Sequence, residues 1–333
     1  MLQPTQTPCA CGRTHAPLDV RVVIGEGALG ALAPVAAAAD GAPLLLFDAI
    51  TFALLGERLI AALGPLGERS APLILGAPGK PFEPNSEAIA AVMTAAREAR
   101  GLVVGVGSGA VNDLGKYVAA QLERPYACVA TAPSMDGYAA PISALFLDGV
   151  KTTVDSKRPD AIVSELDVLL GAPAPLVAAG FGDVLGKLTS LTDWGLGRAL
   201  LDEYYCERIA GDVRAIALDV YERAGEIAQR TPAALGKLMA ALVETGLSVS
   251  YVGNSRPTSG AEHLVSHFVE MWSLNRDSRP PAHGHVVGVA TLCASEIAAA
   301  LAALAANDLP KEAPPIDQAL PEVLGALKLA ESP

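Results

Sequence analysis

Aromatic and charged residues are both scarce in this 333-residue chain, at 5% and 18%, whereas apolar residues make up 51%. Acidic residues outnumber basic ones by 36 to 24, and no run of lysines or arginines occurs. The net charge of −12 and the missing basic run argue against a surface for nucleic acid or for anionic lipid. This profile is typical of an alanine-rich, helix-rich globular enzyme, and the length predicts two domains.

Cysteine is also rare, and its five copies are odd in number, which argues for a reducing compartment. The first residues show no charged segment followed by an apolar one, so no signal peptide is predicted. Apolar stretches such as residues 297–306 fall short of the ~18 residues that a membrane span needs. We therefore expect a soluble, cytoplasmic protein without membrane insertion.

From about residue 20, short apolar runs alternate with helix-periodic segments, which predicts a parallel, doubly wound sheet. We expect this α/β domain to cover residues 19–167. The expected strands are residues 20–24, 43–48, 73–75, 102–106 and 126–131, and the expected helices are residues 29–38, 54–63 and 86–100.

The alternation stops at about residue 165. Beyond it, Pro173, Pro175 and Pro232 separate long segments rich in alanine and leucine, and we expect no further strand. Residues 168–333 are therefore predicted to form an all-helical domain. No internal repeat or low-complexity tract interrupts it.

Residues 1–18 are rich in proline, threonine and cysteine and are predicted to form an arm. Cys9, Cys11 and His15 are close enough in sequence to hold a metal, but a closed zinc site needs four ligands. No fourth ligand is near in the sequence. We therefore favour a free, solvent-exposed arm over a metal knuckle.

A glycine-rich loop, with Gly105, Gly107, Ser108 and Gly109, lies between an expected strand and a helix. Such a loop lets a diphosphate approach the backbone, and the helix N-terminus supplies N–H groups and a favourable dipole. The spacing matches neither G-x-G-x-x-G nor a Walker A loop, and glycine turns also occur there without a ligand. Asp48, which ends an earlier strand, stands where a doubly wound fold places a ribose-binding acid.

The next strand ends in the segment TAPSMDGY, residues 131–138. Its hydroxyls and acid follow the carboxyl end of a strand, which is the ligand-facing edge of such a sheet. A plain turn explains the same composition equally well.

Four of the five histidines fall between residues 263 and 285, namely His263, His267, His283 and His285. The first two share a helical face, and such clustering indicates a metal site, because imidazole is a common metal ligand. Asp183 lies in an apolar, glycine-flanked helical segment, where a lone charge is costly. A helix cap would explain it alone, but beside the histidines we predict a carboxylate ligand.

Six spaced motifs together resemble the glycerol-1-phosphate dehydrogenases, within the iron-containing alcohol dehydrogenase and dehydroquinate synthase superfamily. The resemblance spans most of residues 20–300 and implies an N-terminal NAD(P)-binding α/β domain with a Rossmann-like sheet and a helical, metal-binding C-terminal domain. The motifs are GVGSGAVND, TAPSMDGYAAP, AAGFGDVLGK-x5-DW, EYY, SRPTSGAEHLVSH and HGHVVGVAT.

The resemblance also implies roles for individual residues. One divalent metal, whether zinc, nickel or iron, would be held by Asp183, His263 and His283. Asp136 and His267 would contact the substrate, with Asp183 close to it, although spacing alone would pair His267 with His263 on the metal. The implied dinucleotide contacts are Asp48, Gly109, Ala110, Val111, Asn112, Asp113, Thr131 and Ser134, beside the loop residues Gly105 and Gly107.

Three features depart from the family pattern. Ala140 stands where relatives commonly carry a serine, and the segment FDAITF lacks the asparagine that often follows the acid. Only 50 residues follow His283, fewer than in typical relatives. These departures bear on the cofactor preference between NAD and NADP, on oligomeric packing and on activity.

The implied activity is reversible reduction of dihydroxyacetone phosphate to sn-glycerol 1-phosphate, a reaction of phospholipid metabolism. We expect His267 to relay a proton, because imidazole titrates near working pH. Lys187 and Arg256 are candidates for the phosphate cradle, though either residue fits a surface ion pair. We also expect a homo-oligomer. The alternatives are a glycerol or other polyol dehydrogenase of the same fold, a dehydroquinate-synthase-like lyase and a non-catalytic dinucleotide-binding protein.

Overall fold

The computed structural model describes residues 8–76, 82–147, 150–274, 276, 278 and 280–303. The chain divides into two compact units, residues 1–294 and residues 295–333. The domain boundary predicted at residues 167 and 168 lies inside the first unit and stays a prediction, and residues 304–333 of the predicted helical domain lie outside the described residues.

The main sheet has six parallel strands in the order β1–β8–β5–β4–β2–β3. Five of them coincide with predicted strands, whereas β8 is additional and pairs with both β1 and β5. Its five residues carry no adjoining helical pattern on their N-terminal side, so the alternation did not reveal it. The strands are β1 (Arg21–Gly25), β2 (Leu44–Asp48), β3 (Ala71–Leu75), β4 (Val103–Gly107), β5 (Tyr126–Ala130) and β8 (Ala161–Glu165).

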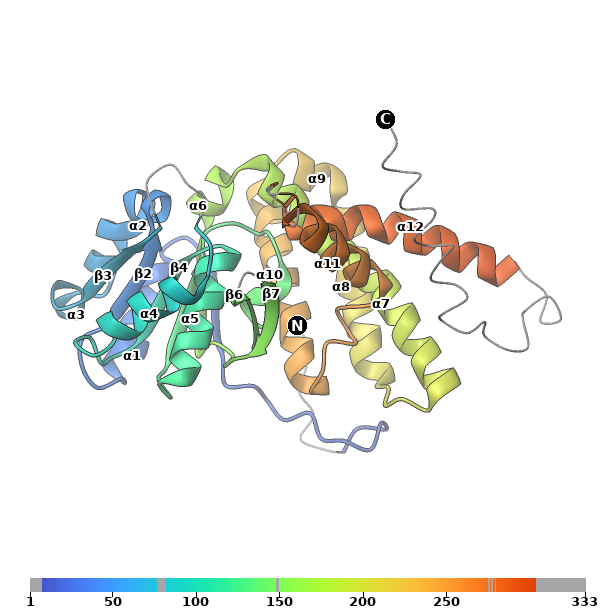
Figure 1. Ribbon diagram of the computed structural model, residues 1–333, viewed down its shortest axis with the longest axis horizontal. Coiled ribbons are helices and arrows are strands. Elements are labelled where there is room, and N and C mark those ends of the chain that lie inside the picture. Colours follow the sequence, from blue (N-terminus) through green and yellow to red (C-terminus); the bar gives the residue numbers. More distant parts are fainter. Residues whose placement is uncertain are drawn as a thin grey trace. The chain divides into compact units, whose positions relative to one another are not determined.

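Helices cover both faces of this sheet because successive side chains of a strand point to opposite sides. Leu44 and Leu46 of β2 pack in one core with α4 and α5, and Leu45 and Phe47 pack in another with α1 and α2. Figure 1 shows β2, β3 and β4 among these helices. The elements are η1 (Ala28–Ala31), α1 (Leu32–Ala37), α2 (Ala49–Ala62), α3 (Pro65–Glu68), α4 (Ser86–Ala95) and α5 (Gly109–Gln121).

A short 3-10 helix, η2 (Asp136–Tyr138), and an antiparallel hairpin of β6 (Ile142–Leu147) and β7 (Val150–Asp155) follow β5. The hairpin was not predicted, and β6 packs against α5 rather than joining the main sheet. It thus extends the α/β part on the side of the glycine-rich loop helix.

Beyond β8 the described residues contain helices and no strand, as predicted. Thr231 caps α10 by accepting a hydrogen bond from the Ala234 N–H at 3.3 Å, and α10 ends at Gly253, whose φ is 84°. The predicted fold class, an α/β part with a Rossmann-like sheet followed by a helical part, is confirmed. The helices are α6 (Leu166–Gly171), α7 (Ala174–Leu201), α8 (Glu207–Glu222), α9 (Ala224–Ala228), α10 (Pro232–Val252), α11 (Ala261–Leu274) and α12 (His283–Ala303).

Two helices, α10 and α12, are long and apolar enough to span a membrane by length and composition. α10 is a core helix, since 61% of its apolar window is buried, whereas only 11% of the α12 window is buried. We expected the apolar stretch at residues 297–306 to be too short for a membrane span. This expectation is wrong, because the helix that contains its described part, α12, begins at His283 and is long enough.

The prediction of a free arm is wrong for its described residues, 8–18, although most of these residues are solvent-exposed as predicted. His15 is only 4% exposed, and the Arg13 guanidinium donates a hydrogen bond at 2.8 Å to the carbonyl of Val252 at the end of α10. The same guanidinium lies 3.5 Å from the centre of the Tyr204 ring. The arm is docked on the helical part, through contacts to residues almost 200 or more positions away that local sequence patterns cannot show.

Candidate metal and dinucleotide site

Glycines bring the predicted metal ligands on α7 and α12 together. A Cβ at Gly182 would lie 2.4 Å from the carbonyl oxygen of Gly284, and a Cβ at Gly284 would lie 2.0 Å from that of Ala179. Only glycine fits such a close approach of two backbones. The contact places His283, the first residue of α12, beside Asp183 of α7.

Asp183, His263 and His283 form a compact cluster. One ligand atom from each of the three lies within 4.8 Å of the others, and His263 Nε2 is 3.6 Å from Asp183 Oδ1. Asp183 is fully buried and His263 is 6% exposed, while His283 is half-buried. The consecutive helices α11 and α12 thus supply two imidazoles, and the distant helix α7 supplies one carboxylate.

A carboxylate stands behind each imidazole. Glu262 contacts His263 Nδ1 at 2.7 Å, and Glu270 contacts His283 Nδ1 at 2.8 Å. Engaging Nδ1 leaves Nε2 as the ligand atom, which is the arrangement of metal-binding histidines. Sequence reasoning missed both acids, although Glu270 lies seven residues after His263 and therefore on the same helical face.

The surroundings of the cluster favour the ionised form of Asp183. Burial alone would raise the pKa of Asp183, but Lys187 and His263 hold that pKa below its ordinary value. Burial would likewise lower the pKa of His263, yet hydrogen bonds to Asp183 and Glu262 raise it. An ionised carboxylate with two oriented imidazoles fits a divalent metal such as zinc, iron or nickel.

Lys187 lies inside the site rather than on the surface. It is fully buried, its Nζ is 2.9 Å from Asp183 Oδ1 and 2.8 Å from Asp136 Oδ2, and it donates to the Thr258 carbonyl at 3.2 Å. The Asp136 N–H also donates to Asp183 Oδ2 at 2.7 Å. The surface-pair alternative for Lys187 is therefore wrong. Asp136 borders the metal cluster, and its implied contact with the substrate stays a prediction.

His267 lies beside the cluster without joining it. Its ring centre is 6.3 Å from that of His263 and 5.9 Å from that of His283. Burial, followed by the charge of His283, lowers the pKa of His267 to about 4. This pKa lies below the near-neutral value that we expected, and the proton-relay role of His267 stays a prediction.

Glu270 also forms an ion pair with the ammonium of Lys151, which belongs to β7 of the hairpin. A side chain of the α/β part therefore contacts the acid that orients His283. His285, two residues further along α12, is half-buried and outside the cluster.

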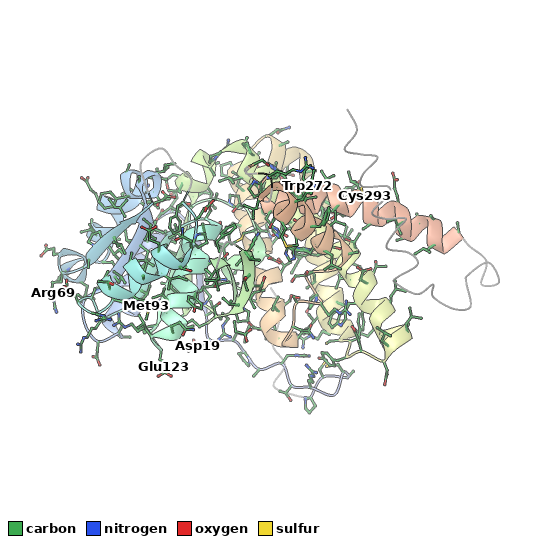
Figure 2. The ribbon with its side chains drawn as sticks, viewed as in Figure 1. Asp19, Arg69, Met93, Glu123, Trp272 and Cys293 are labelled. Atoms are coloured by element: carbon green, nitrogen blue, oxygen red, sulfur yellow. The ribbon has the colours of Figure 1, made fainter. Side chains whose placement is uncertain are left out.

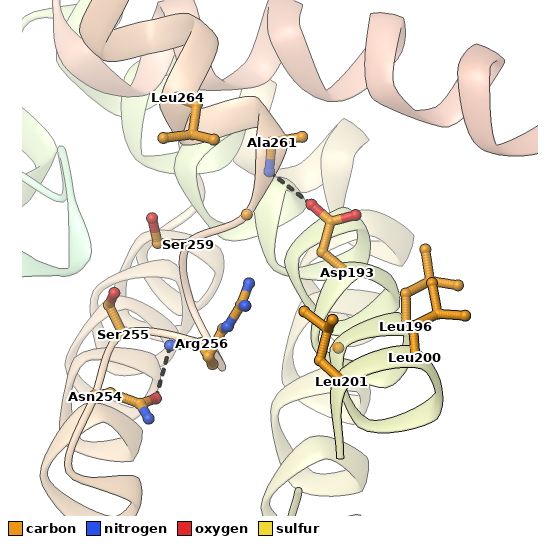
Figure 3. Close-up of a pocket in the computed structure, with 12 residues that line it drawn as sticks. Asp193, Leu196, Leu200, Leu201, Asn254, Ser255, Arg256, Ser259, Ala261 and Leu264 are labelled. Atoms are coloured by element: carbon orange, nitrogen blue, oxygen red, sulfur yellow. Dashed lines mark hydrogen bonds between the residues drawn. The ribbon is translucent and has the colours of Figure 1, made fainter. Parts of the chain in front are cut away.

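Arg256 stands apart from the metal cluster. It pairs with Glu203 and lines a cavity of about 630 Å³ together with Asp193 and Leu264 (Figure 3). None of the three candidate ligands lines this cavity. The ion-pair alternative accounts for Arg256, and Lys187 is the predicted cation that reaches the metal cluster.

The glycine-rich loop presents backbone rather than side chains. Ser108 precedes α5 and makes no side-chain cap, so the N–H groups of the first helical turn are available to an anion. A Cβ at Gly109 would meet the Met135 side chain at 3.1 Å, whereas Gly105 lies under the Tyr126 hydroxyl, 2.3 Å from the position of a Cβ. The absence of a side chain at 105 therefore serves packing.

Several predicted dinucleotide contacts have side chains that point into the protein. Val111 is buried in the core, and the Asn112 side chain contacts the Tyr126 hydroxyl at 3.1 Å. Asp113 lies 3.1 Å from the Lys116 ammonium, and burial raises the pKa of Asp113. At these positions only the backbone is left to face a cofactor.

Asp48 caps α2 in a reciprocal arrangement. Its Oδ1 accepts from the Thr51 N–H at 2.7 Å, and the Thr51 hydroxyl accepts from the Asp48 N–H at 3.0 Å. Thr131 follows β5, where its N–H donates to the Gly107 carbonyl, and the Ser134 hydroxyl lies 3.1 Å from that of Tyr138. Asp48 ends β2, and Thr131 and Ser134 follow β5, so all three lie at the carboxyl ends of the two strands that flank β4.

Lys116 fastens α5 to the segment that carries Asp136. Its buried ammonium donates to the carbonyls of Gly137, Ala140 and Ile142. Sequence reasoning missed this residue, which resembles an ordinary helix-surface lysine. The Ala140 position that departs from the family is 3% exposed, and its carbonyl takes part in this contact.

Comparison with known proteins identifies the fold and the family of the chain. The family model for iron-containing alcohol dehydrogenase matches residues 23–173. In fold, the chain is similar to sulfoacetaldehyde reductase from Bifidobacterium kashiwanohense, solved in complex with NAD+, with a TM-score of 0.67 and 16% identity over 84% of this chain and 76% of that one. These matches define the class as an iron-containing alcohol dehydrogenase fold.

Relatives with similar sequences show which family within this fold class the chain belongs to. Glycerol-1-phosphate dehydrogenase [NAD(P)+] from Bacillus licheniformis is 32% identical over 87% of this chain and 73% of the relative. The enzyme of the same name from Bacillus velezensis is 38% identical over 59% of this chain and half of its own length. The chain belongs to the glycerol-1-phosphate dehydrogenase family.

Proposed function

We propose that this protein interconverts dihydroxyacetone phosphate and sn-glycerol 1-phosphate with NAD(P)H and one divalent metal. The cluster of Asp183, His263 and His283 carries the proposal, because three protein ligands leave a position for a substrate oxygen. The relatives named glycerol-1-phosphate dehydrogenase [NAD(P)+] support the choice of substrate and cofactor.

Asp183, His263 and His283 would hold the metal through a carboxylate oxygen and two Nε2 atoms. When bound, the metal supplies Lewis acidity toward the ketone oxygen, and NAD(P)H supplies the hydride. Glu262 and Glu270 fix the tautomer and the orientation of the two imidazoles. Adding back zinc, nickel or iron to the chelated protein determines which metal the site prefers.

The surrounding residues have separate tasks in this proposal. Asp136 and the ammonium of Lys187 border the position of the substrate, and Lys187 supplies the cation that an anionic substrate needs. His267, whose pKa is lowered to about 4, would relay a proton by accepting one proton at one ring nitrogen and releasing another from the second nitrogen. The α5 N-terminus binds the cofactor diphosphate through backbone N–H groups.

An oxidation assay tests the proposal. Purified protein, stripped by a chelator and then reloaded with zinc, nickel or iron in separate samples, is mixed with dihydroxyacetone phosphate and NADH or NADPH. We expect turnover that chelation abolishes and one metal restores best. The reverse reaction is run with sn-glycerol 1-phosphate, sn-glycerol 3-phosphate and glycerol.

Preference for the 1-phosphate supports the assignment. Fast oxidation of glycerol without turnover of either phosphate ester contradicts it and favours a polyol dehydrogenase. A metal-free protein that binds NADH and reduces nothing contradicts it in favour of a binding protein.

A further inference from the structure

A second group of metal-binding side chains lies where the arm meets the helical part. Cys9, Cys11 and His15 converge with Cys206, and one ligand atom from each lies within 4.8 Å of the others. We propose that these four residues bind one zinc ion in a closed site that fixes the arm to the helical part. This proposal does not depend on the proposed enzymatic function.

The distances between the ligand atoms are those of a zinc tetrahedron. Cys9 Sγ and Cys206 Sγ are 3.8 Å apart, and His15 Nε2 is 3.3 Å from Cys11 Sγ and 3.4 Å from Cys206 Sγ. Zinc bonds of about 2.3 Å to sulfur and about 2.0 Å to nitrogen give tetrahedron edges of about 3.8 Å between two sulfurs and about 3.5 Å between sulfur and nitrogen. The side chains therefore surround a space of the right size for the ion.

Burial supports a bound ion. Cys206 is fully buried and His15 is 4% exposed, so two of the four ligands are shielded from solvent. The polar contacts of Nε2 are to sulfur atoms, which are weak hydrogen-bond partners. Because buried polar groups are normally well satisfied, a metal bond at Nε2 gives this imidazole the strong partner that it otherwise lacks.

The local backbone holds the two arm thiols on one side. The Gly12 N–H donates to the Cys9 carbonyl at 2.8 Å, and the Cys9 N–H donates to the Arg13 carbonyl at 2.9 Å. This tight turn depends on Gly12, whose φ is 85°. The Tyr204 hydroxyl lies 3.2 Å from Cys11 Sγ and closes the site on the side of the α7–α8 connection.

Two other readings of the cluster account for less. A disulfide between Cys9 and Cys206 would leave Cys11 and His15 without a role, and a reducing compartment opposes it. A second catalytic metal would need an open coordination position, whereas four protein ligands complete the shell. The chemistry of three thiolates and one imidazole selects zinc.

The experiment removes the other metal cluster first. The His263→Ala/His283→Ala variant is produced in zinc-supplemented medium, and its metal content and X-ray absorption are measured. We expect one zinc per chain with a sulfur shell at about 2.3 Å. Adding Cys206→Ser should abolish that zinc, whereas Cys293→Ser, at an exposed position of α12, should retain it (Figure 2).

A second readout needs no substitution in the arm. Treating the same folded variant with a mercurial thiol reagent should release its zinc to a colorimetric indicator. Three results would overturn the proposal: no zinc in the double variant, zinc with only nitrogen and oxygen neighbours, or a Cys9–Cys206 disulfide in protein purified without oxidant. Circular dichroism confirms that each variant compared is folded.

Discussion

The Asp183 cluster and the Cys206 cluster use different donors and different surroundings. The first combines oxygen and nitrogen donors, has a glutamate behind each imidazole and lies beside the Lys187 ammonium. The second has three cysteine sulfurs and the imidazole of His15, whose Nδ1 has no hydrogen-bond partner among the described residues. Three ligands with oriented histidines suit chemistry at an open position, whereas four ligands suit a purely structural role.

Replacing His283 should give the largest difference in effect between the two clusters. We expect His283→Ala to lower kcat/KM by about 10³-fold, because the metal supplies several kcal/mol of charge stabilisation. The zinc of the Cys206 cluster should remain. Metal analysis and the dihydroxyacetone phosphate assay measure both effects.

His285→Ala is the matched control, since this histidine lies on the same helix outside the cluster. It should change kcat/KM by less than about twofold. Loss of the active-site metal in this control would mean that the choice between the two histidines is wrong.

The next effect concerns stability. We expect Cys206→Ser to lower Tm by about 4–8 °C through loss of the ion that ties the arm to the helical part. At temperatures below unfolding, kcat should stay within about twofold of wild type. Thermal denaturation with and without chelator checks this, and an unchanged Tm together with lost activity would assign the cluster to catalysis.

The glutamate behind His283 gives a smaller change. We expect Glu270→Gln to weaken metal binding at the Asp183 cluster by about 10–100-fold, because the amide no longer orients the imidazole as an anion does. Zinc at the Cys206 cluster should be unaffected. Competition with a fluorescent chelator measures both affinities, and equal weakening at the two clusters would contradict the distinction between them.

The smallest effects are expected for residues that lie outside both clusters. Asp48→Asn keeps a good helix cap but removes the predicted ribose-binding carboxylate, so KM for NADH should rise about tenfold at unchanged Tm. Thr51→Ala breaks the reciprocal cap and should cost about 0.5–1 kcal/mol of stability without changing KM. The reverse pattern would make Asp48 only a cap.

Local patterns account for most of the fold and for part of the site. Apolar alternation located five strands, and histidine clustering pointed to α11 and α12, because both signals lie within short segments. No α-helix directly precedes β6, β7 or β8, so the alternation of strand and helix did not reveal them. Cys206 joins its partners from about 190 residues away, and no spacing rule spans such a distance.

The site residues that were missed act behind the ligands. Glu262, Glu270 and Lys116 are charged residues of the kind that usually lie on the exposed face of a helix. In the structure all three are buried. Their roles depend on which helices meet, which follows from glycine contacts such as that between Gly182 and Gly284. Such contacts are a property of the assembled chain rather than of any segment.

The contact between Lys151 and Glu270 has a thermodynamic consequence. Lys151 belongs to the hairpin of the α/β part, and Glu270 holds the imidazole of His283. A change in hairpin position therefore alters the affinity of the metal cluster, and metal binding must favour one hairpin position by the same free energy. Metal and dinucleotide affinities should then be linked reciprocally, so that titrating either one in the presence of the other yields a single coupling constant.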